Sequence, residues 1–345
     1  RSRNNVFIYS TKSLTIEMDS FRTRISAPSF PFSISHDTTL TLLGSCFAEN
    51  MGQKLKDRKF NVLTNPFGIL FNPFSVVNAL ERMLNNRPYT SSELVNVDEH
   101  WGSLDHHGVF KNRSLDGAVL DINDSLEKGR NQLLGSDVIF ITLGSAWAYR
   151  HIERNHLVAN CHKIPNKEFK KELLSFQDAH LILRHIPQFL ASMKINAKVV
   201  FTVSPVRHWK DGAVENSRSK SILNSAVHEV VDEYENCHYF PSYEYMMDDL
   251  RDYRFYGADM LHPTEQAVGY IWDKFQESLF DETTVAMSQA VSAIMDAASH
   301  RPMDPESNSY QRFLKKQLEI IDELEAKNPA LDFAAERERF EGFRL

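Results

Sequence analysis

The chain has 345 residues, which exceeds the roughly 100 to 200 residues of an ordinary domain and favours one large domain with an appendage. Hydrophobic residues make up 42% of the chain, enough for a sizeable core. With a formal net charge of −7 at pH 7, the chain lacks the excess of lysine and arginine that nucleic-acid binding requires, so we expect no nucleic-acid partner.

Cysteine content and hydropathy indicate the compartment. The sequence contains three cysteines, Cys46, Cys161 and Cys237, too few for the disulfide framework of a small secreted domain. No uncharged apolar stretch approaches the roughly 18 residues that span a bilayer, and the apolar run at residues 6–9 is too short for a signal peptide. We therefore predict a reduced, cytoplasmic protein without membrane association.

The N-terminal segment differs from the rest of the chain. Residues 1–17 show no clear periodicity and precede Met18. We expect Met18 to be the natural start and residues 1–17 to be a non-native or disordered extension. Residues 18–282 are then predicted to form the main domain.

Strand-like and helical patterns alternate through the main domain, which is typical of βαβ units around a mainly parallel sheet. Strands are predicted at residues 40–43, 60–63, 138–143, 197–203 and 238–240, and helices at residues 48–57, 73–84, 118–134, 177–193, 216–234 and 263–275. The predicted fold class is α/β, a three-layer α/β/α sandwich with a mainly parallel, five-stranded sheet of flavodoxin-like type.

Three segments lie outside this alternation. Residues 85–116 and 149–169 fit neither period and are predicted to be insertions over a rim of the sheet, where loops usually carry specificity. We expect the second of them to be an irregular loop or hairpin. Beyond residue 283 the pattern is helical and strongly charged, which predicts a C-terminal helical hairpin over residues 283–345.

A candidate nucleophile follows the first predicted strand. Gly44 permits a tight turn, and the next helix directs its N–H groups and a partial positive charge at this point. Cys46 can form a thiolate there, whereas Ser45 needs a base to become nucleophilic. Each also has a structural interpretation, Cys46 as a small buried residue and Ser45 as a helix cap.

A candidate general base lies near the end of the main domain. Asp259 and His262 are three residues apart, directly before the sixth predicted helix. The carboxylate can orient one ring nitrogen while the other accepts a proton. An isolated pair of this kind can also be a capping aspartate beside a surface histidine, so its interpretation depends on the nucleophile turn.

Several blocks carry a resemblance to a known family. Gly44-Ser45-Cys46-Phe47-Ala48 reproduces the signature of the GSCFA domain family. Similar blocks are Asn65-Pro66-Phe67-Gly68, Thr142-Leu143-Gly144-Ser145-Ala146-Trp147, Ala159-Asn160-Cys161-His162-Lys163, Ser204-Pro205-Val206-Arg207-His208 and Arg251-Asp252-Tyr253-Arg254-Phe255-Tyr256. The resemblance covers residues 21–275 approximately and extends in fold to the SGNH (GDSL-type) hydrolases.

The resemblance implies roles for individual residues. The SGNH pattern has a nucleophile after the first strand, oxyanion donors in two later loops and a terminal Asp-x-x-His. Laying G-S-C-F over G-D-S-L without a gap makes Cys46 the nucleophile, and the alternative register makes it Ser45. Ala146 replaces the usual asparagine donor, which is worth a few kcal/mol. The oxyanion and substrate-binding candidates are Gly68, Asn65, Asn72, Gly144, Ser145, Asn160, His162, Arg207 and His208.

Two of these candidates follow the fourth predicted strand. Arg207 can clamp a carboxylate or phosphate through two parallel hydrogen bonds, or it can pair with a structural acid. Cys161-His162 and Asp105-His106-His107 lack the ligand spacing of zinc sites, so no catalytic metal is expected. No phosphate-binding glycine loop occurs, and no cofactor is predicted.

The sequence thus predicts a hydrolase that cleaves an ester or related acyl bond through a covalent acyl-enzyme. Cys46 or Ser45 attacks, His262 moves the proton and Asp259 orients His262. The expected substrate is a small-molecule or glycan acyl ester. An acyltransferase with the same residues and a catalytically silent binding protein are the alternatives, and the oligomeric state is unknown.

Overall fold

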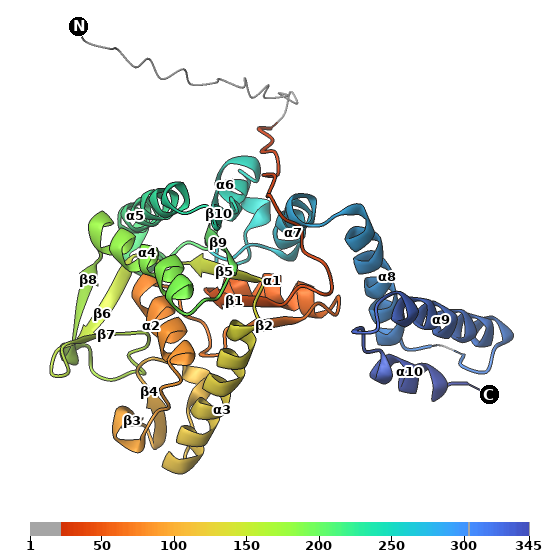
Figure 1. The fold of residues 1–345 in the computed structure, drawn as a ribbon, viewed down its shortest axis with the longest axis horizontal. Helices are drawn as coiled ribbons and strands as arrows, with labels where there is room; N and C mark the ends of the chain where they lie inside the picture. The colour runs from red at the N-terminus through yellow and green to blue at the C-terminus, as the bar shows by residue number, and fades with distance from the viewer. Residues whose placement is uncertain (1–21, 303, 345) are drawn as a thin grey trace, which may run out of the picture.

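The centre of the molecule is a parallel sheet. The computed structural model describes residues 22–302 and 304–344, so residues 1–17 and Met18 lie outside the described residues. Figure 1 shows the sheet, whose five strands have the order β10-β9-β5-β1-β2. The strands are β1 (Leu40–Gly44), β2 (Val62–Thr64), β5 (Val138–Leu143), β9 (Lys198–Val203) and β10 (Cys237–Tyr239), and every pairing between them is parallel. The predicted sheet is confirmed.

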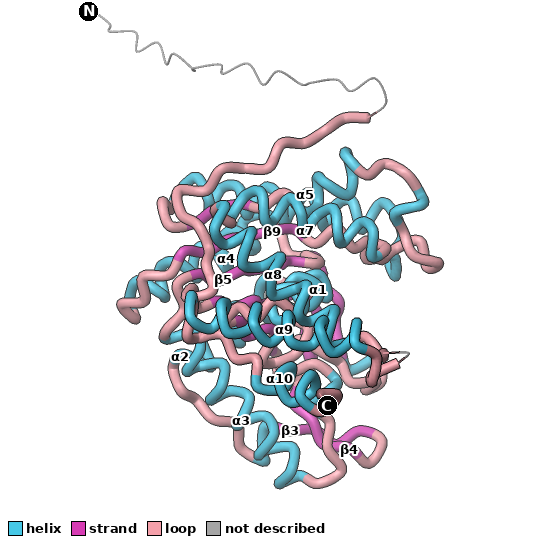
Figure 2. The backbone as a smooth tube through the Cα atoms, turned by 90° about the vertical axis from the view of Figure 1, so that its right-hand side faces the viewer, coloured by secondary structure: helices cyan, strands magenta, loops and turns pink. Residues whose placement is uncertain are grey.

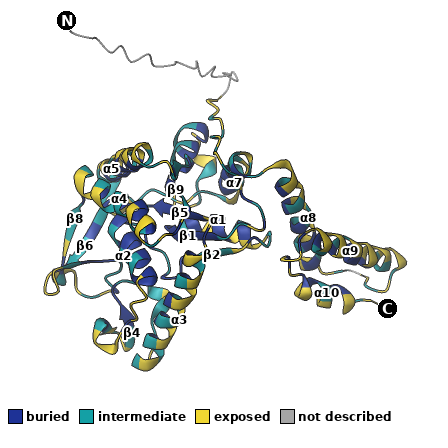
Figure 3. Ribbon diagram, in the orientation of Figure 1, coloured by how far each residue is buried: buried dark blue, intermediate teal, exposed yellow. Residues whose placement is uncertain are grey.

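Helices cover both faces of the sheet because its strands are apolar on both sides. Along β5, Ile139 and Ile141 enter one hydrophobic core while Val138 and Phe140 enter the other. The first core is closed by α2 (Pro73–Leu84), α3 (Leu115–Leu134), α4 (Phe176–Ser192) and α5 (Gly212–Glu233), and the second by α1 (Cys46–Lys56) and α7 (Glu265–Leu279). Figure 3 shows the buried strands between these layers. The predicted three-layer sandwich is confirmed.

The two predicted insertions contain antiparallel strands. A hairpin of β3 (Leu94–Val97) and β4 (His100–Ser103) lies within residues 85–116. A three-stranded sheet in the order β7-β6-β8 includes much of the second insertion, with β6 (Trp147–His151), β7 (His156–Val158) and β8 (Phe169–Leu173). These strands have three to five residues, too few for a clear period in the sequence.

The C-terminal helices form a separate cluster beside the main body (Figure 1), and in Figure 2 they lie on the side that faces the viewer. They are α8 (Glu282–Ser299), α9 (Asn308–Lys327) and α10 (Ala334–Glu341), and they share their own hydrophobic core. The predicted hairpin corresponds to α8 and α9, to which α10 adds a third helix. Lys59 joins the two parts through an ion pair of 3.0 Å with Glu336. Within the described ranges, no helix is both long enough and apolar enough to cross a membrane.

The sheet changes its direction of growth at β1. The chain passes from β1 to β2 on one side and later places β5 on the other side, and ligands of such sheets bind at this switch point. Gly44 ends β1 with a φ of +139°, and its N–H donates to Asn65 Oδ1 at 2.7 Å. The N–H of Ser45 donates to the Thr142 carbonyl at 3.0 Å. These bonds fix where Cys46 begins α1.

Replacing Gly44 is expected to destabilise the protein strongly. A Cβ at this position would lie 2.1 Å from the Thr142 carbonyl oxygen, on a backbone conformation that L-residues rarely adopt. Gly44→Ala should lower the free energy of unfolding by about 3 kcal/mol or more in urea denaturation. Gly269→Ala is the matched control, since no heavy atom lies within 4 Å of its added Cβ. Inside α7 it should stabilise by about 0.5 to 1 kcal/mol, and similar effects of both changes would contradict the account.

Candidate active site

The two candidate nucleophiles have different environments. Ser45 is buried and is the N-cap of α1, where its Oγ accepts a hydrogen bond from the Phe47 N–H at 3.3 Å. This is the structural role of a helix cap. Cys46 is the first residue of α1, and its free thiol is partly exposed. The geometry therefore leaves Cys46 more available for reaction than Ser45.

Cys46 lies at a small cavity of about 110 Å³, which we name the nucleophile cavity. Its walls come from the loops after β1, β2, β5 and β9, so it lies at the carboxyl ends of the strands. The lining residues are Ser45, Cys46, Ile69, Phe71, Gly144, Ser145, Ser204, Val206, Arg207 and His208. Six of the residues predicted for the site are therefore brought together here, namely Ser45, Cys46, Gly144, Ser145, Arg207 and His208.

A buried lysine adjoins this cavity. Lys220 of α5 is 1% exposed, and its Nζ donates a hydrogen bond of 2.7 Å to the carbonyl of Ser204, a residue that lines the cavity. No carboxylate of the described residues lies within ion-pair distance of Lys220. Burial lowers the pKa of Lys220 to about 7, and the Cys46 thiolate acts in the opposite direction. An ammonium group buried without a counter-ion is costly and marks a candidate functional site.

Lys220 was not predicted from the sequence, because a lysine inside a predicted helix is normally solvent-exposed. A signal was present in the spacing of the helix. Leu223 and Val227 lie three and seven residues further along α5, and both are fully buried. Lys220 therefore occupies the apolar face of the helix, where a charged residue requires an explanation.

The protonation of Cys46 reflects opposing effects. Burial raises the pKa of the thiol, while hydrogen bonds from the backbone N–H groups of Cys46 and Phe47 and the charge of Lys220 lower it. Burial is the largest effect, so the pKa lies above its ordinary value. A thiol of this kind needs a proton acceptor before it attacks.

The predicted pair of Asp259 and His262 is formed. His262 Nδ1 lies 2.6 Å from Asp259 Oδ2, and the N–H groups of Leu261 and His262 donate to Asp259 Oδ1 at 2.9 and 3.0 Å. These bonds hold the pKa of the Asp259 carboxyl well below its usual range. Both side chains are about half exposed. No hydrogen bond within the described residues joins His262 to Cys46 or Ser45, and His262 does not line the nucleophile cavity.

His208 is the imidazole that lines the nucleophile cavity. Its Nδ1 lies 3.6 Å from Asp211 Oδ2, and burial lowers the pKa of the ring. Asp211 also pairs with Lys171 of β8. The predicted substrate-binding residue is therefore also positioned to accept a proton.

The predicted backbone donors are engaged elsewhere. The Gly68 N–H donates to the Asn65 carbonyl at 2.7 Å, and the N–H groups of Gly144 and Ser145 donate to the Phe71 carbonyl at 2.7 and 3.1 Å. An oxyanion at Cys46 would therefore need other donors in this conformation. The N–H groups of Cys46 and Phe47 are candidates because both lower the pKa of the Cys46 thiol, although the Phe47 N–H also donates to Ser45 Oγ.

The side chains of the predicted asparagine donors Asn65 and Asn72 are engaged in hydrogen bonds to other protein groups. Asn65 is buried and holds Gly44 through Oδ1, while its Nδ2 donates to Glu49 at 2.7 Å. Asn72 caps α2 through two hydrogen bonds to Ser75, each 2.9 Å long. Both side chains support the walls of the site, and neither lines the nucleophile cavity. Their assignment as oxyanion donors is not supported by these contacts.

The remaining histidine blocks make contacts outside the nucleophile cavity. Asn160 Oδ1 accepts from the His162 N–H at 2.8 Å, and His162 Nε2 lies 2.6 Å from the Ser103 carbonyl. The buried ring of His106 stacks on Phe67 at 4.0 Å, and burial lowers its pKa to about 3. Asn160 and His162 therefore lie outside the nucleophile cavity. The described residues contain no group of three or more side chains arranged to hold a metal ion.

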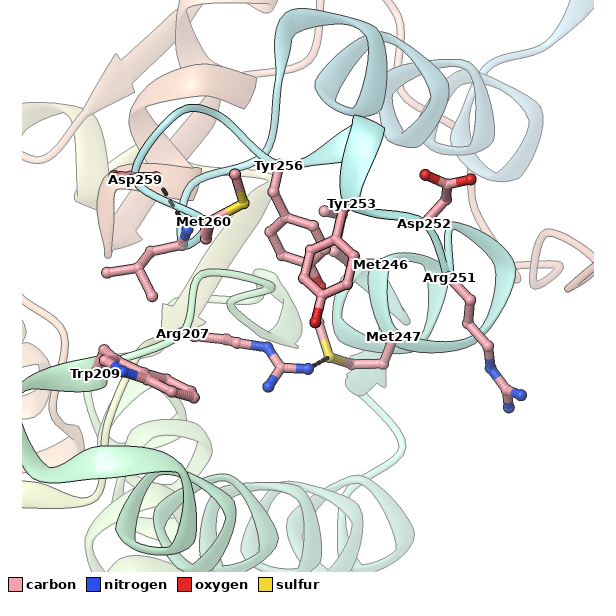
Figure 4. Close-up of a pocket in the computed structure, with 11 residues that line it drawn as sticks. Arg207, Trp209, Met246, Met247, Arg251, Asp252, Tyr253, Tyr256, Asp259 and Met260 are labelled. Carbon is pink, nitrogen blue, oxygen red and sulfur yellow. Dashed lines mark hydrogen bonds between the residues drawn. The ribbon is translucent and has the colours of Figure 1, made fainter.

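Arg207 also borders a second, larger space. This arginine cavity measures about 460 Å³ and is lined by Arg207, Trp209, Met246, Met247, Arg251, Asp252, Tyr253, Tyr256, Asp259, Met260 and Leu261 (Figure 4). Arg207 lines both cavities, and Asp259 lines the second. Asp259, though not His262, thus lines a space that adjoins the nucleophile cavity.

Comparison with known protein families agrees with the family resemblance of the sequence motifs. Residues 39–275 match the model of the GSCFA family. The chain belongs to the GSCFA family. Residues 291–342 match the C-terminal domain of GSCFA domain proteins, which corresponds to the second half of α8 and to α9 and α10. A search of the curated proteins finds no match.

The buried charge of Lys220 in this GSCFA protein predicts a specific pH dependence of stability. A lysine in the unfolded chain keeps its ordinary pKa of 10.5, whereas folding lowers it to about 7. Between these values the unfolded chain binds more protons, so the stability contributed by this site rises with pH. Lys220→Met removes the effect, and each pKa unit corresponds to about 1.4 kcal/mol. From pH 7 to pH 10, denaturant titrations should therefore show wild type gaining a few kcal/mol relative to the variant. Parallel pH profiles would contradict the assignment.

Proposed function

We propose that this GSCFA protein is an SGNH-like hydrolase that cleaves an ester or related acyl bond with Cys46 as nucleophile. The observation that supports it best is the position of Cys46, at the switch point of the sheet, beside a cavity and close to the unpaired charge of Lys220. A buried cation and a helix N-terminus both favour a thiolate. This chemistry needs no cofactor, and a cytoplasmic location stays a prediction.

The proposed reaction has two steps. In the first, a proton leaves the Cys46 thiol, the sulfur forms a bond to the acyl carbon, and the bond from this carbon to the leaving oxygen breaks. The proton passes through an imidazole to the leaving oxygen, giving a thioester and a free alcohol. In the second, water attacks the thioester, releases the acid and returns the proton to Cys46.

The resemblance to SGNH hydrolases assigns the proton transfer to His262. The hydrogen bond to Asp259 holds Nδ1 and leaves Nε2 as the acceptor. A movement of the loop before α7 must bring this ring to Cys46, and Met260 in this loop has a φ of +59°. His208 is the competing acceptor because it already lines the nucleophile cavity.

A catalytically silent binding protein is the second candidate. It is favoured by the hydrogen bonds that occupy the N–H groups of Gly68, Gly144 and Ser145. An acyl-enzyme requires stabilisation of an oxyanion, and the loss of one donor typically lowers kcat by a factor of about 100 to 1,000. Under this proposal the two cavities bind a ligand that is released unchanged.

Single substitutions test the hydrolase against the binding protein. Activated p-nitrophenyl esters serve as substrates, and mass spectrometry of the intact and digested protein detects the acyl group. We expect wild type to accumulate an adduct on Cys46, Cys46→Ala to form none, and His262→Ala to lose at least about 100-fold in kcat. Ser45→Ala should keep turnover and lose about 1 kcal/mol of stability as an N-cap variant.

The other outcomes are equally informative. Loss of turnover in His208→Ala with normal turnover in His262→Ala would move the general base to His208. Absence of turnover and of any adduct in folded wild type would contradict the hydrolase and support the binding protein. Near-ultraviolet circular dichroism of each variant separates these results from unfolding.

A further inference from the structure

The arginine cavity contains an arginine without an ionic partner. Arg207 follows β9, and no carboxylate of the described residues lies within ion-pair distance of its guanidinium. Its recorded side-chain hydrogen bond runs from Nη2 to the sulfur of Met247 at 3.4 Å, and a thioether is a weak acceptor. Figure 4 shows Arg207 extending across the cavity toward Met247 and Tyr253. A guanidinium carries five N–H donors, so most of its hydrogen-bonding capacity is unused.

The other charged residues that line this cavity are already paired. Arg251 forms an ion pair of 2.9 Å with Asp248, and Asp252 forms one of 2.9 Å with Arg254. Asp259 is bonded to His262. Among the charged residues that line this cavity, Arg207 therefore has no oppositely charged partner within the described residues. The sequence left open that Arg207 pairs with a structural aspartate or glutamate. No such ion pair occurs within the described residues.

The remaining walls suit an organic molecule that carries a charge at one end. Trp209, Tyr253 and Tyr256 contribute aromatic faces, and Met246 and Met247 contribute apolar surface. About 460 Å³ is enough for a small organic ligand. Because Arg207 also lines the nucleophile cavity, a group bound to it would lie close to Cys46.

We propose that Arg207 binds an anionic group, a carboxylate or a phosphate, on an acyl substrate whose body lies in the arginine cavity and whose acyl carbon reaches Cys46. This inference deepens the proposed hydrolase function and rests on it for the position of the acyl carbon. Binding of the anion itself requires only Arg207 and the cavity. The planar fork of the guanidinium matches two oxygens of a carboxylate or phosphate.

A matched pair of esters tests the substrate class. The mono-p-nitrophenyl ester of glutaric acid has a terminal carboxylate, and p-nitrophenyl valerate has the same chain length without charge. Wild type should prefer the anionic ester at least tenfold in kcat/KM. Arg207→Gln should abolish this preference, and Arg207→Lys should keep part of it. Arg339→Gln makes the same change in net charge on α10, outside both cavities, and should keep all of the preference. Equal use of both esters by wild type, or an unchanged preference in Arg207→Gln, would overturn the proposal.

Binding without turnover separates this inference from the proposed function. Glutarate and inorganic phosphate are added separately to Cys46→Ala protein, alone and combined with Arg207→Gln or Arg339→Gln. At least one of the two anions should raise the Tm, and Arg207→Gln should remove the rise while Arg339→Gln keeps it. The anion that acts distinguishes a carboxylate from a phosphate substrate. No rise with either anion, or a rise that Arg207→Gln leaves unchanged, would overturn the anion site even if esters are hydrolysed. Failure of all ester hydrolysis with an Arg207-dependent rise would contradict only the hydrolase.

Discussion

The candidate site depends on one interaction, the burial of the Lys220 ammonium beneath the cavity that contains Cys46. The ammonium donates a hydrogen bond to the Ser204 carbonyl and lies 5.8 Å from the centre of the Tyr243 ring, and no carboxylate of the described residues pairs with it. Such a group destabilises the fold at neutral pH, where a methionine of similar size would not. Its presence is understandable if the positive charge serves Cys46, whose thiolate is the anion that interacts with it.

The sheet brings these groups together because its topology changes direction between β1 and β5. Gly44 allows the chain to turn against β5, and the Asn65 side chain holds this turn from the loop after β2. The loops after β5 and β9 contribute the opposite walls. Four strand ends, widely separated in the sequence, thus meet around the thiol of Cys46, as expected at a switch point of a parallel sheet.

Periodicity was sufficient to predict the elements that bury most surface. The ranges 73–84 and 138–143 agree with α2 and β5 at both ends, since each has an unbroken apolar pattern and clear boundary residues. The sheet of β6, β7 and β8 was not predicted, because its short strands are held by pairing with one another. Amino-acid preferences along the chain say little about which short strands pair with one another.

The sequence identified candidate site residues more readily than it predicted which of them lie together. Cys46, Ser45, Gly144, Ser145, Arg207 and His208 share one cavity, whereas Asn65, Asn72, Asn160 and His162 hydrogen-bond to other protein groups outside it. An asparagine that caps a helix and one that binds an oxyanion have the same local sequence. Which role applies depends on tertiary contacts, as does the burial of Lys220, so only the structure could distinguish them.

The most direct test of the coupling between Lys220 and Cys46 is the rate at which iodoacetamide alkylates Cys46 as a function of pH, mapped by mass spectrometry. Below about pH 7, where Lys220 keeps its proton, its charge favours the Cys46 thiolate, so Lys220→Met should slow the alkylation of Cys46 in this range. Cys161, whose thiol is influenced by Lys210 instead, provides the internal control and should be unchanged. Superimposable Cys46 profiles for wild type and Lys220→Met would contradict the account.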